Sequence, residues 1–451
     1  MLTSRFTLAK NAAVVLLLVM SAQVFTVPFA QADEAQATSS GILPLADYSG
    51  NFAKRSYLLG DFGNKRTEWA KKGFTFDIDY NQYFQAVTDG GLEQSSEYGG
   101  TINYNVNLDF DRMGLIPGGL LQLRARSRYG NSVNGISGSL IPVNGDPTLL
   151  TASNLDENIA LWLPMINYTQ FLSEEFALGF GKYDLFDSPN EFAGGRGRSQ
   201  WWNQNLNMPV SPLLIVPNVT TGAMAMVLPN PNLMLIGLVG TITDTSNTSG
   251  FDNFDDGLFS ALMVTYQYEL VELPGGLVFI PGYGWNRDFT EINARIHIEK
   301  GQLEPTTKDN TWFVSLEFWQ YLWTEGSGEQ SVDINNGRQD LQGVGVFARF
   351  QDADPDTNPL DYDLSGGINA KGLIPWRDND AMGIAYSYTR LQKGRFFDAV
   401  GIADSSSAWE AFYNVELTPA VHLTLDAQVV ESSFPDIDTA TILGTSMEIL
   451  F

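Results

Sequence analysis

Three arginines alternate with other residues in the stretch GLLQLRARSRYG, Gly119–Gly130. Successive side chains of a β-strand point to opposite faces, so Arg124, Arg126 and Arg128 would share one face of a strand. Each guanidinium carries five hydrogen-bond donors and no acceptor. In one interpretation the row is a structural ladder, paired with acidic residues of neighbouring strands: Asp77, Asp79 and Asp109. In the other interpretation the row is part of a water-exposed wall that donates hydrogen bonds to hydroxyl groups of a passing solute. The two interpretations are compatible.

A second set of chemically useful side chains lies in the glycine-rich stretch Ser188–Leu214, which contains Arg196, Arg198, Trp201 and Trp202. Loops of this length often carry function. Flat aromatic faces beside hydrogen-bond donors suit a pyranose ring, which has an apolar face and a polar edge. The alternative is that the two tryptophans belong to an aromatic girdle at a membrane interface.

Metal and catalytic sites find little support. The stretch DADPDTNPLDYD places oxygen ligands at Asp352, Asp354 and Asp356, as a Ca²⁺ loop would, but it lacks the glycine and glutamate of an EF-hand, so we favour a solvated acidic loop and no metal. The two histidines are His297 and His422, and neither comes with the serine and acid that a hydrolase triad needs. We therefore expect neither an enzyme nor a cofactor.

Alternation of apolar and polar residues dominates the chain after Gly73. In Tyr98–Phe110 the apolar side chains share one face with the tyrosine, and threonine, asparagines and aspartate share the other. Phe74–Ala86 and Trp409–Leu417 repeat the pattern. Counting such runs gives about sixteen strands of roughly ten residues, the length that crosses a bilayer at a tilt, although eighteen strands remain an alternative. We interpret Ile292–Glu299 as part of a hairpin extension within a loop.

The connections support an antiparallel transmembrane β-barrel. Compact Pro/Gly turns follow the even-numbered strands, for example Gly114–Gly119 and Gly372–Trp376. Longer polar segments follow the odd-numbered strands, as 131–155 and 185–220 do. Short periplasmic turns and long extracellular loops are typical of outer-membrane barrels, whereas a soluble two-sheet sandwich of this size would be unusual. The stretch Thr324–Asp340 is long for the short-turn side.

Composition and the chain ends add the cellular context. Basic residues followed by the run AAVVLLLVM and by AQA predict a signal peptide over 1–32. We expect 33–73 to form a periplasmic or pore-mouth segment with a short helix within Gly60–Gly73, and 74–451 to form the barrel. A formal net charge of −26 argues against nucleic acid as a partner. The terminal Phe451 resembles the signal that the barrel assembly machinery reads, and outer-membrane lipid and lipopolysaccharide would surround the barrel.

Three stretches together resemble the carbohydrate-selective porin family of the OprB type: Leu58–Phe74, Leu341–Asp380 and Ala411–Val430. The resemblance implies a bacterial outer-membrane channel that admits mono- or oligosaccharides by passive diffusion, without cofactor or energy coupling. It also implies that inward polar residues line the sugar path, and Lys182 and Asp184 join the arginine row as candidates. A general or ion-selective porin without sugar specificity is the alternative.

Overall fold

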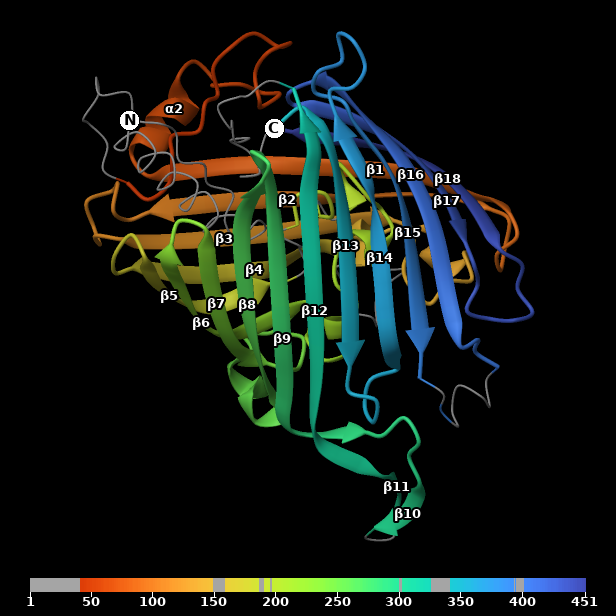
Figure 1. Cartoon of the computed structure of the whole chain (residues 1–451). Coiled ribbons are helices and arrows are strands. Elements are labelled where there is room, and N and C mark those ends of the chain that lie inside the picture. The colour runs from red at the N-terminus through yellow and green to blue at the C-terminus, as the bar shows by residue number, and fades with distance from the viewer. Residues whose placement is uncertain are drawn as a thin grey trace.

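The fold is that of a computed structural model, which describes residues 41–148, 159–185, 190–194, 197–299, 302–325, 341–392, 394 and 401–451. Sixteen strands close one antiparallel barrel, in which neighbours in sequence are neighbours in space and β1 pairs with β18 (Figure 1). The barrel strands are β1 (Phe74–Asp89), β2 (Ser96–Asp109), β3 (Gly119–Gly130), β4 (Ile159–Phe171), β5 (Phe176–Asp184), β6 (Val219–Asn230), β7 (Leu233–Thr241), β8 (Leu258–Leu270), β9 (Leu273–Thr290), β12 (Thr307–Thr324), β13 (Gly343–Ala353), β14 (Leu360–Lys371), β15 (Ala381–Leu391), β16 (Ser405–Thr418), β17 (Val421–Val430) and β18 (Ala440–Leu450).

The remaining two strands form a separate hairpin. β10 (Ile296–Glu299) pairs with β11 (Gln302–Pro305), and the hairpin projects from the connection between β9 and β12 (Figure 1). The predicted sixteen-stranded barrel is therefore confirmed, and the hairpin accounts for the two extra strands of the alternative count. The long connection predicted after Thr324 lies mostly outside the described residues, since 326–340 are not among them.

The pattern of burial is the reverse of that in a soluble protein. On β17, Leu425 and Val429 point outward and are 49% and 46% exposed, whereas the intervening Asp426 and Gln428 point inward and are 5% and 1% exposed. An outward apolar face and an inward polar face are what a barrel between lipid and a polar lumen requires. No helix among the described residues is both long enough and apolar enough to span a membrane.

The two rims differ as predicted. The β6–β7, β8–β9 and β16–β17 connections have two residues each, at 231–232, 271–272 and 419–420. The β3–β4 and β5–β6 connections, 131–158 and 185–218, leave the opposite rim. Two-residue turns fit antiparallel neighbours, whereas the long loops have enough chain to enter the barrel.

The N-terminal segment docks at the short-turn rim, where β1 extends past the end of β18. Its helix α2 (Lys65–Lys71) carries Arg66, which is 4% exposed. Nη2 of Arg66 donates to the carbonyls of Phe451 (3.1 Å) and Phe76 (3.2 Å) and pairs with Asp77 at 2.5 Å. The ring of Tyr48 lies 3.9 Å from the guanidinium, and burial raises the pKa of that tyrosine. One arginine thus ties α2 to both strands of the barrel seam.

Candidate functional site

The arginine row lies on the lumen face of β3. Arg124, Arg126 and Arg128 are 9%, 1% and 2% exposed, and the leucines between Gly119 and Arg124 that point the other way are more exposed. Asp184 at the end of β5 accepts a hydrogen bond from Nη2 of Arg126 at 3.0 Å and lies 3.6 Å from Nη1 of Arg124. Asn105 accepts from Nε of Arg124 at 2.8 Å. The row is thus held by an acid and by amides of the neighbouring strands.

Of the three aspartates expected to pair with the row, Asp79 acts on Arg124 as a nearby charge, and the other two have other partners. Asp77 binds Arg66 and accepts a hydrogen bond from Tyr48. Asp109 accepts the backbone amides of Ile42 and Leu43, at 2.8 and 2.9 Å. These two carboxylates therefore fasten the N-terminal segment.

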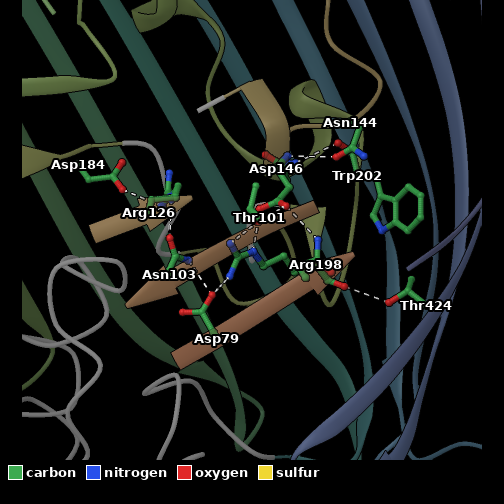
Figure 2. Close-up of polar contacts among 12 residues, drawn as sticks. Asp79, Thr101, Asn103, Arg126, Asn144, Asp146, Asp184, Arg198, Trp202 and Thr424 are labelled. Carbon is green, nitrogen blue, oxygen red and sulfur yellow. Dashed lines mark hydrogen bonds and ion pairs between the residues drawn. The ribbon is translucent and has the colours of Figure 1, made fainter. Parts of the chain in front are cut away.

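Asp79 belongs to a cluster built around Arg198, in the β5–β6 loop. The guanidinium of Arg198 donates from Nε to Asp146 at 2.8 Å, from Nη2 to Thr101 at 2.9 Å, and from Nη1 to Asp79 (Figure 2). Its backbone carbonyl accepts a hydrogen bond from Thr424 of β17 at 3.0 Å. Because these partners lie on β1, β2, β17 and the β3–β4 loop, Arg198 fixes the β5–β6 loop across the lumen.

Charge compensation stabilises this buried cluster. Asp146 is 1% exposed and accepts hydrogen bonds from Asn81 (3.0 Å) and Thr101 (2.6 Å) in addition to Arg198. Burial alone would lower the pKa of Arg198, but the negative charges of Asp146 and Asp79 outweigh it and raise that pKa above the ordinary value. The guanidinium is therefore permanently charged.

Two further wall side chains, on β16 and β13, hold the same loop. The carboxylate of Glu410 on β16 accepts the consecutive amides of Trp202 and Asn203, at 2.5 and 2.9 Å. Oε1 of Gln351 on β13 accepts the consecutive amides of Val210 and Ser211, at 2.7 and 2.8 Å. Between these two points lies the short helix α3 (Gln204–Asn207). We call Glu410 and Gln351 the wall clamps.

Both tryptophans of the loop are 0% exposed. The Trp201 ring packs 4.7 Å from the ring of Phe412 and 5.6 Å from that of Phe347, and its Nε1 donates to the carbonyl of Phe192 at 2.6 Å. The Trp202 ring packs closely on Gly444: a Cβ added to Gly444 would lie 2.4 Å from the Trp202 ring. Neither ring presents a face to lipid or to a solute in this structure, and both anchor the loop.

Lys182 makes its hydrogen bond within the barrel wall. It follows Phe180, which is 61% exposed on the outer face of β5, and precedes Tyr183, which packs in an apolar cluster with Met224. Lys182 is 7% exposed, and its Nζ donates to the carbonyl of Leu163 at 3.3 Å. Lys182 is therefore buried in the wall, directly after Gly181, whose φ of +134° interrupts the alternation of β5. Arg196 lies outside the described residues.

The acidic stretch after β13 is held by a lysine. Nζ of Lys308 lies 2.8 Å from Asp354 and 3.1 Å from Asp356, and Asp352 accepts the amide of Ala353. Within the part of the chain that the structure describes, no three His, Asp or Glu residues are arranged to hold a metal ion.

Sequence reasoning missed the residues that position the loop: Thr101, Asp146, Gln351, Glu410 and Thr424. Four of them lie on strands, and their inward-facing positions follow from the same two-residue alternation that placed the arginine row. Asp146 lies in a loop without periodicity, so no local pattern pointed to it.

The sequence model of one protein family, described as "Carbohydrate-selective porin, OprB family", matches residues 93–451. The high-pH structure of Pseudomonas putida OprB is 15% identical, with a TM-score of 0.74, over 89% of this chain and 100% of that chain. The low-pH structure of the same protein is 16% identical, with a TM-score of 0.54, over 88% and 99%. No curated protein matches the chain in sequence.

Proposed function

The chain belongs to the OprB family of carbohydrate-selective porins, which makes it a sugar-conducting channel of the bacterial outer membrane, and we propose that sugars pass along the lumen wall formed by β1, β2 and β3. The polar groups on this wall that keep accessible surface would make the contacts. They are Asp77, Asp79 and Arg124, whose side chains are 20%, 17% and 10% exposed, and the half-buried Asn105.

The alternation of donors and acceptors on this wall is the observation that carries the proposal. Arg124 supplies donors, Asp79 supplies acceptors and Asn105 supplies both. A sugar hydroxyl both donates and accepts, so it can exchange water for these groups one contact at a time. Such contacts must stay weak, because a solute that binds tightly leaves a channel slowly.

The buried members of the site have a supporting part in this proposal. Arg126, Arg128 and Asp184 would fix the wall behind Arg124, while Arg198, Trp201 and Trp202 would hold the β5–β6 loop inward and so limit the bore. Lys182 would stabilise the wall at Leu163, and Asp109 would hold the N-terminal segment at the mouth.

The proposal contains no catalytic step and no cofactor. His422 is the one histidine whose side chain the structure describes, and the neighbour of its Nδ1 is the amide oxygen of Asn414 at 3.3 Å. An amide in that position does not make a nucleophile and base pair. Transport would be driven by the sugar gradient alone.

Outer-membrane lipid and lipopolysaccharide would contact the outward apolar faces, and the assembly machinery would read Phe451 before the barrel closes. In the closed barrel the amide of Phe451 donates to the carbonyl of Ile78 at 2.7 Å. Pairing of the last residue with β1 suits a signal that is read first and then built into the seam.

Liposome swelling tests the sugar path. Vesicles containing the protein should swell faster in neutral sugars than in uncharged non-sugar solutes of equal size. Replacing Arg124, Arg126 and Arg128 together by alanine should reduce this difference while the barrel still shows its heat-dependent shift on gels. Equal swelling rates for sugars and matched solutes in the unmodified protein would favour a general porin. Unchanged sugar entry in the triple variant would remove the arginine row from the path.

A further inference from the structure

A row of three ionisable side chains crosses the lumen face of β16, β17 and β18. His422 on β17 is paired in register with Glu416 of β16 on one side and Glu448 of β18 on the other. Directly opposed residues in an antiparallel sheet have Cβ atoms about 5 Å apart. The three side chains therefore form one continuous Glu–His–Glu row.

The row faces the lumen. His422 is on the same face of β17 as Thr424, which donates to the carbonyl of Arg198 in the inward-folded loop. All three side chains of the row are half-buried, so they keep accessible surface, in contrast to the 1% and 2% exposed fractions of Arg126 and Arg128. Charges with accessible surface act most directly on a passing solute.

One arginine lies beside Glu416 but is already paired: Nη2 of Arg377 donates to the backbone carbonyl of Glu416 at 3.2 Å, and its guanidinium forms an ion pair with Asp380. Among the residues that the structure describes, no basic side chain lies within ion-pair distance of Glu416 or Glu448. Asn379 donates to Oε1 of Glu416 at 2.8 Å, and Arg198 acts on Glu448 only as a more distant charge that is already paired with Asp79 and Asp146. His422 is thus the group of the row that can offset the negative charge.

We propose that the Glu416–His422–Glu448 row is a charge filter that discriminates against anionic sugars, and that protonation of His422 relaxes it. Histidine is the side chain type that ordinarily changes its charge between pH 5 and 8. With a neutral imidazole the row has two negative charges and repels sugar acids. With an imidazolium one of the two charges is offset, so sugar acids enter more readily. Charged rings set selectivity in the same way in other channels.

The groups that face His422 define what the test must separate. They are Glu416 and Asn414 on β16 and Glu448 on β18, with Arg377 and Asp380 of the β14–β15 turn bonded to the backbone of Glu416, and with Asp79, Arg198 and Asp146 beyond Glu448. Glu410 and Asp426 lie farther along the same lumen faces. The inference rests on the proposed sugar channel, but its readout is charge selectivity, which can be measured apart from sugar preference.

Reversal potentials in a potassium glucuronate gradient, across planar bilayers at pH 8 and pH 5, test the filter. A sugar carboxylate stays ionised at both values, so the permeability ratio of glucuronate to potassium reports the protein. We expect this ratio to rise about threefold from pH 8 to pH 5 in the unmodified channel. It should stay low at both values in His422→Gln and high at both in His422→Lys. His297→Gln, which removes the other histidine, should behave as the unmodified protein.

A wild-type pH response in His422→Gln would assign the effect to other groups and overturn the proposal, and so would a ratio that is independent of pH in the unmodified channel. Each variant is first checked for the heat-dependent gel shift of a folded barrel. If the channel shows the His422-dependent response but no preference for neutral sugars over matched solutes, the proposed function fails and the charge filter stands.

Discussion

Arg198 and Asp146 form a buried ion pair, with 2.8 Å between Nε and Oδ1, that joins two long loops inside the barrel. Asp146 belongs to the β3–β4 connection and Arg198 to the β5–β6 connection. Both also bind Thr101 on β2. The pair therefore links the two loops to each other and to the wall.

Replacing Arg198 by alanine should widen the channel and weaken sugar discrimination. The change leaves Asp146 buried without its cation, and loss of one partner of a buried pair typically costs about 3–5 kcal/mol. The loop can avoid this cost by leaving the wall, so single-channel conductance should rise. Arg198→Lys keeps the positive charge but lacks the forked guanidinium, so its conductance should lie between that of the unmodified protein and that of Arg198→Ala. Unchanged conductance in Arg198→Ala would mean that the loop is held without this residue.

Glu410→Gln should loosen the β5–β6 loop at one wall clamp. The carboxylate accepts two adjacent amides, and the glutamine can offer an oxygen to only one of them, which leaves an amide that costs about 1–3 kcal/mol when buried without an acceptor. Hydrogen exchange at residues 202–205 should become about tenfold faster or more, since 1.4 kcal/mol corresponds to tenfold. Glu431→Gln, at an exposed position, is the matched control. Equal exchange in both variants would exclude Glu410 as a clamp.

Arg66→Ala should lower the temperature at which the folded barrel converts to the unfolded band on gels. The side chain donates to the carbonyls of Gly60, Phe76 and Phe451 as well as to Asp77. Hydrogen bonds from a charged donor contribute about 1.5–3 kcal/mol each, although they are not additive. Lys71→Ala, on the exposed side of α2, should leave the conversion temperature unchanged. A conversion temperature equal to that of the unmodified protein would show that the seam does not depend on Arg66.

Asp380, in the turn between β14 and β15, should make this rim sensitive to acid. Burial alone would raise its pKa, but hydrogen bonds from Arg377 (2.7 Å from each donor) and from Tyr413 outweigh burial and hold the pKa below the usual value. Because the folded-state value is the lower one, the stabilisation is present above about pH 4 and is lost as the pH falls through the folded-state value.

The measurement is the heat-unfolding midpoint of the unmodified protein and of Asp380→Asn between pH 7 and pH 2.5. The variant should be less stable at pH 7, by about 1 kcal/mol because the pair is partly exposed, and the difference should shrink toward acid pH. A constant difference over the whole range would show that the charge of Asp380 contributes nothing.

The barrel could be predicted because successive residues of each strand in a membrane barrel face lipid and lumen in turn. Leu425 and Asp426 are neighbours in sequence, and their exposed fractions of 49% and 5% follow directly from alternation. The same rule placed Arg124, Arg126 and Arg128 in the lumen. Lys182 shows where the rule stops, because Gly181, with a φ of +134°, interrupts the alternation of β5 just before it.

The contacts between loops and wall could not be predicted from local sequence. Trp201 and Trp202 lie in a loop that has no fixed period, so their burial depends on partners such as Glu410, more than 200 residues away in the chain. Asp184 rather than Asp109 neutralises the arginine row for the same reason, since the choice depends on how the ends of β3 and β5 meet.

Current through single channels in planar bilayers, with increasing concentrations of neutral sugars, tests the central claim most directly. The account predicts brief, saturable interruptions of current by sugar in the unmodified channel, and severalfold weaker block in Arg124→Ala at unchanged folding. Currents that fall with sugar only as far as the conductivity of the bulk solution falls, in both proteins, would contradict it.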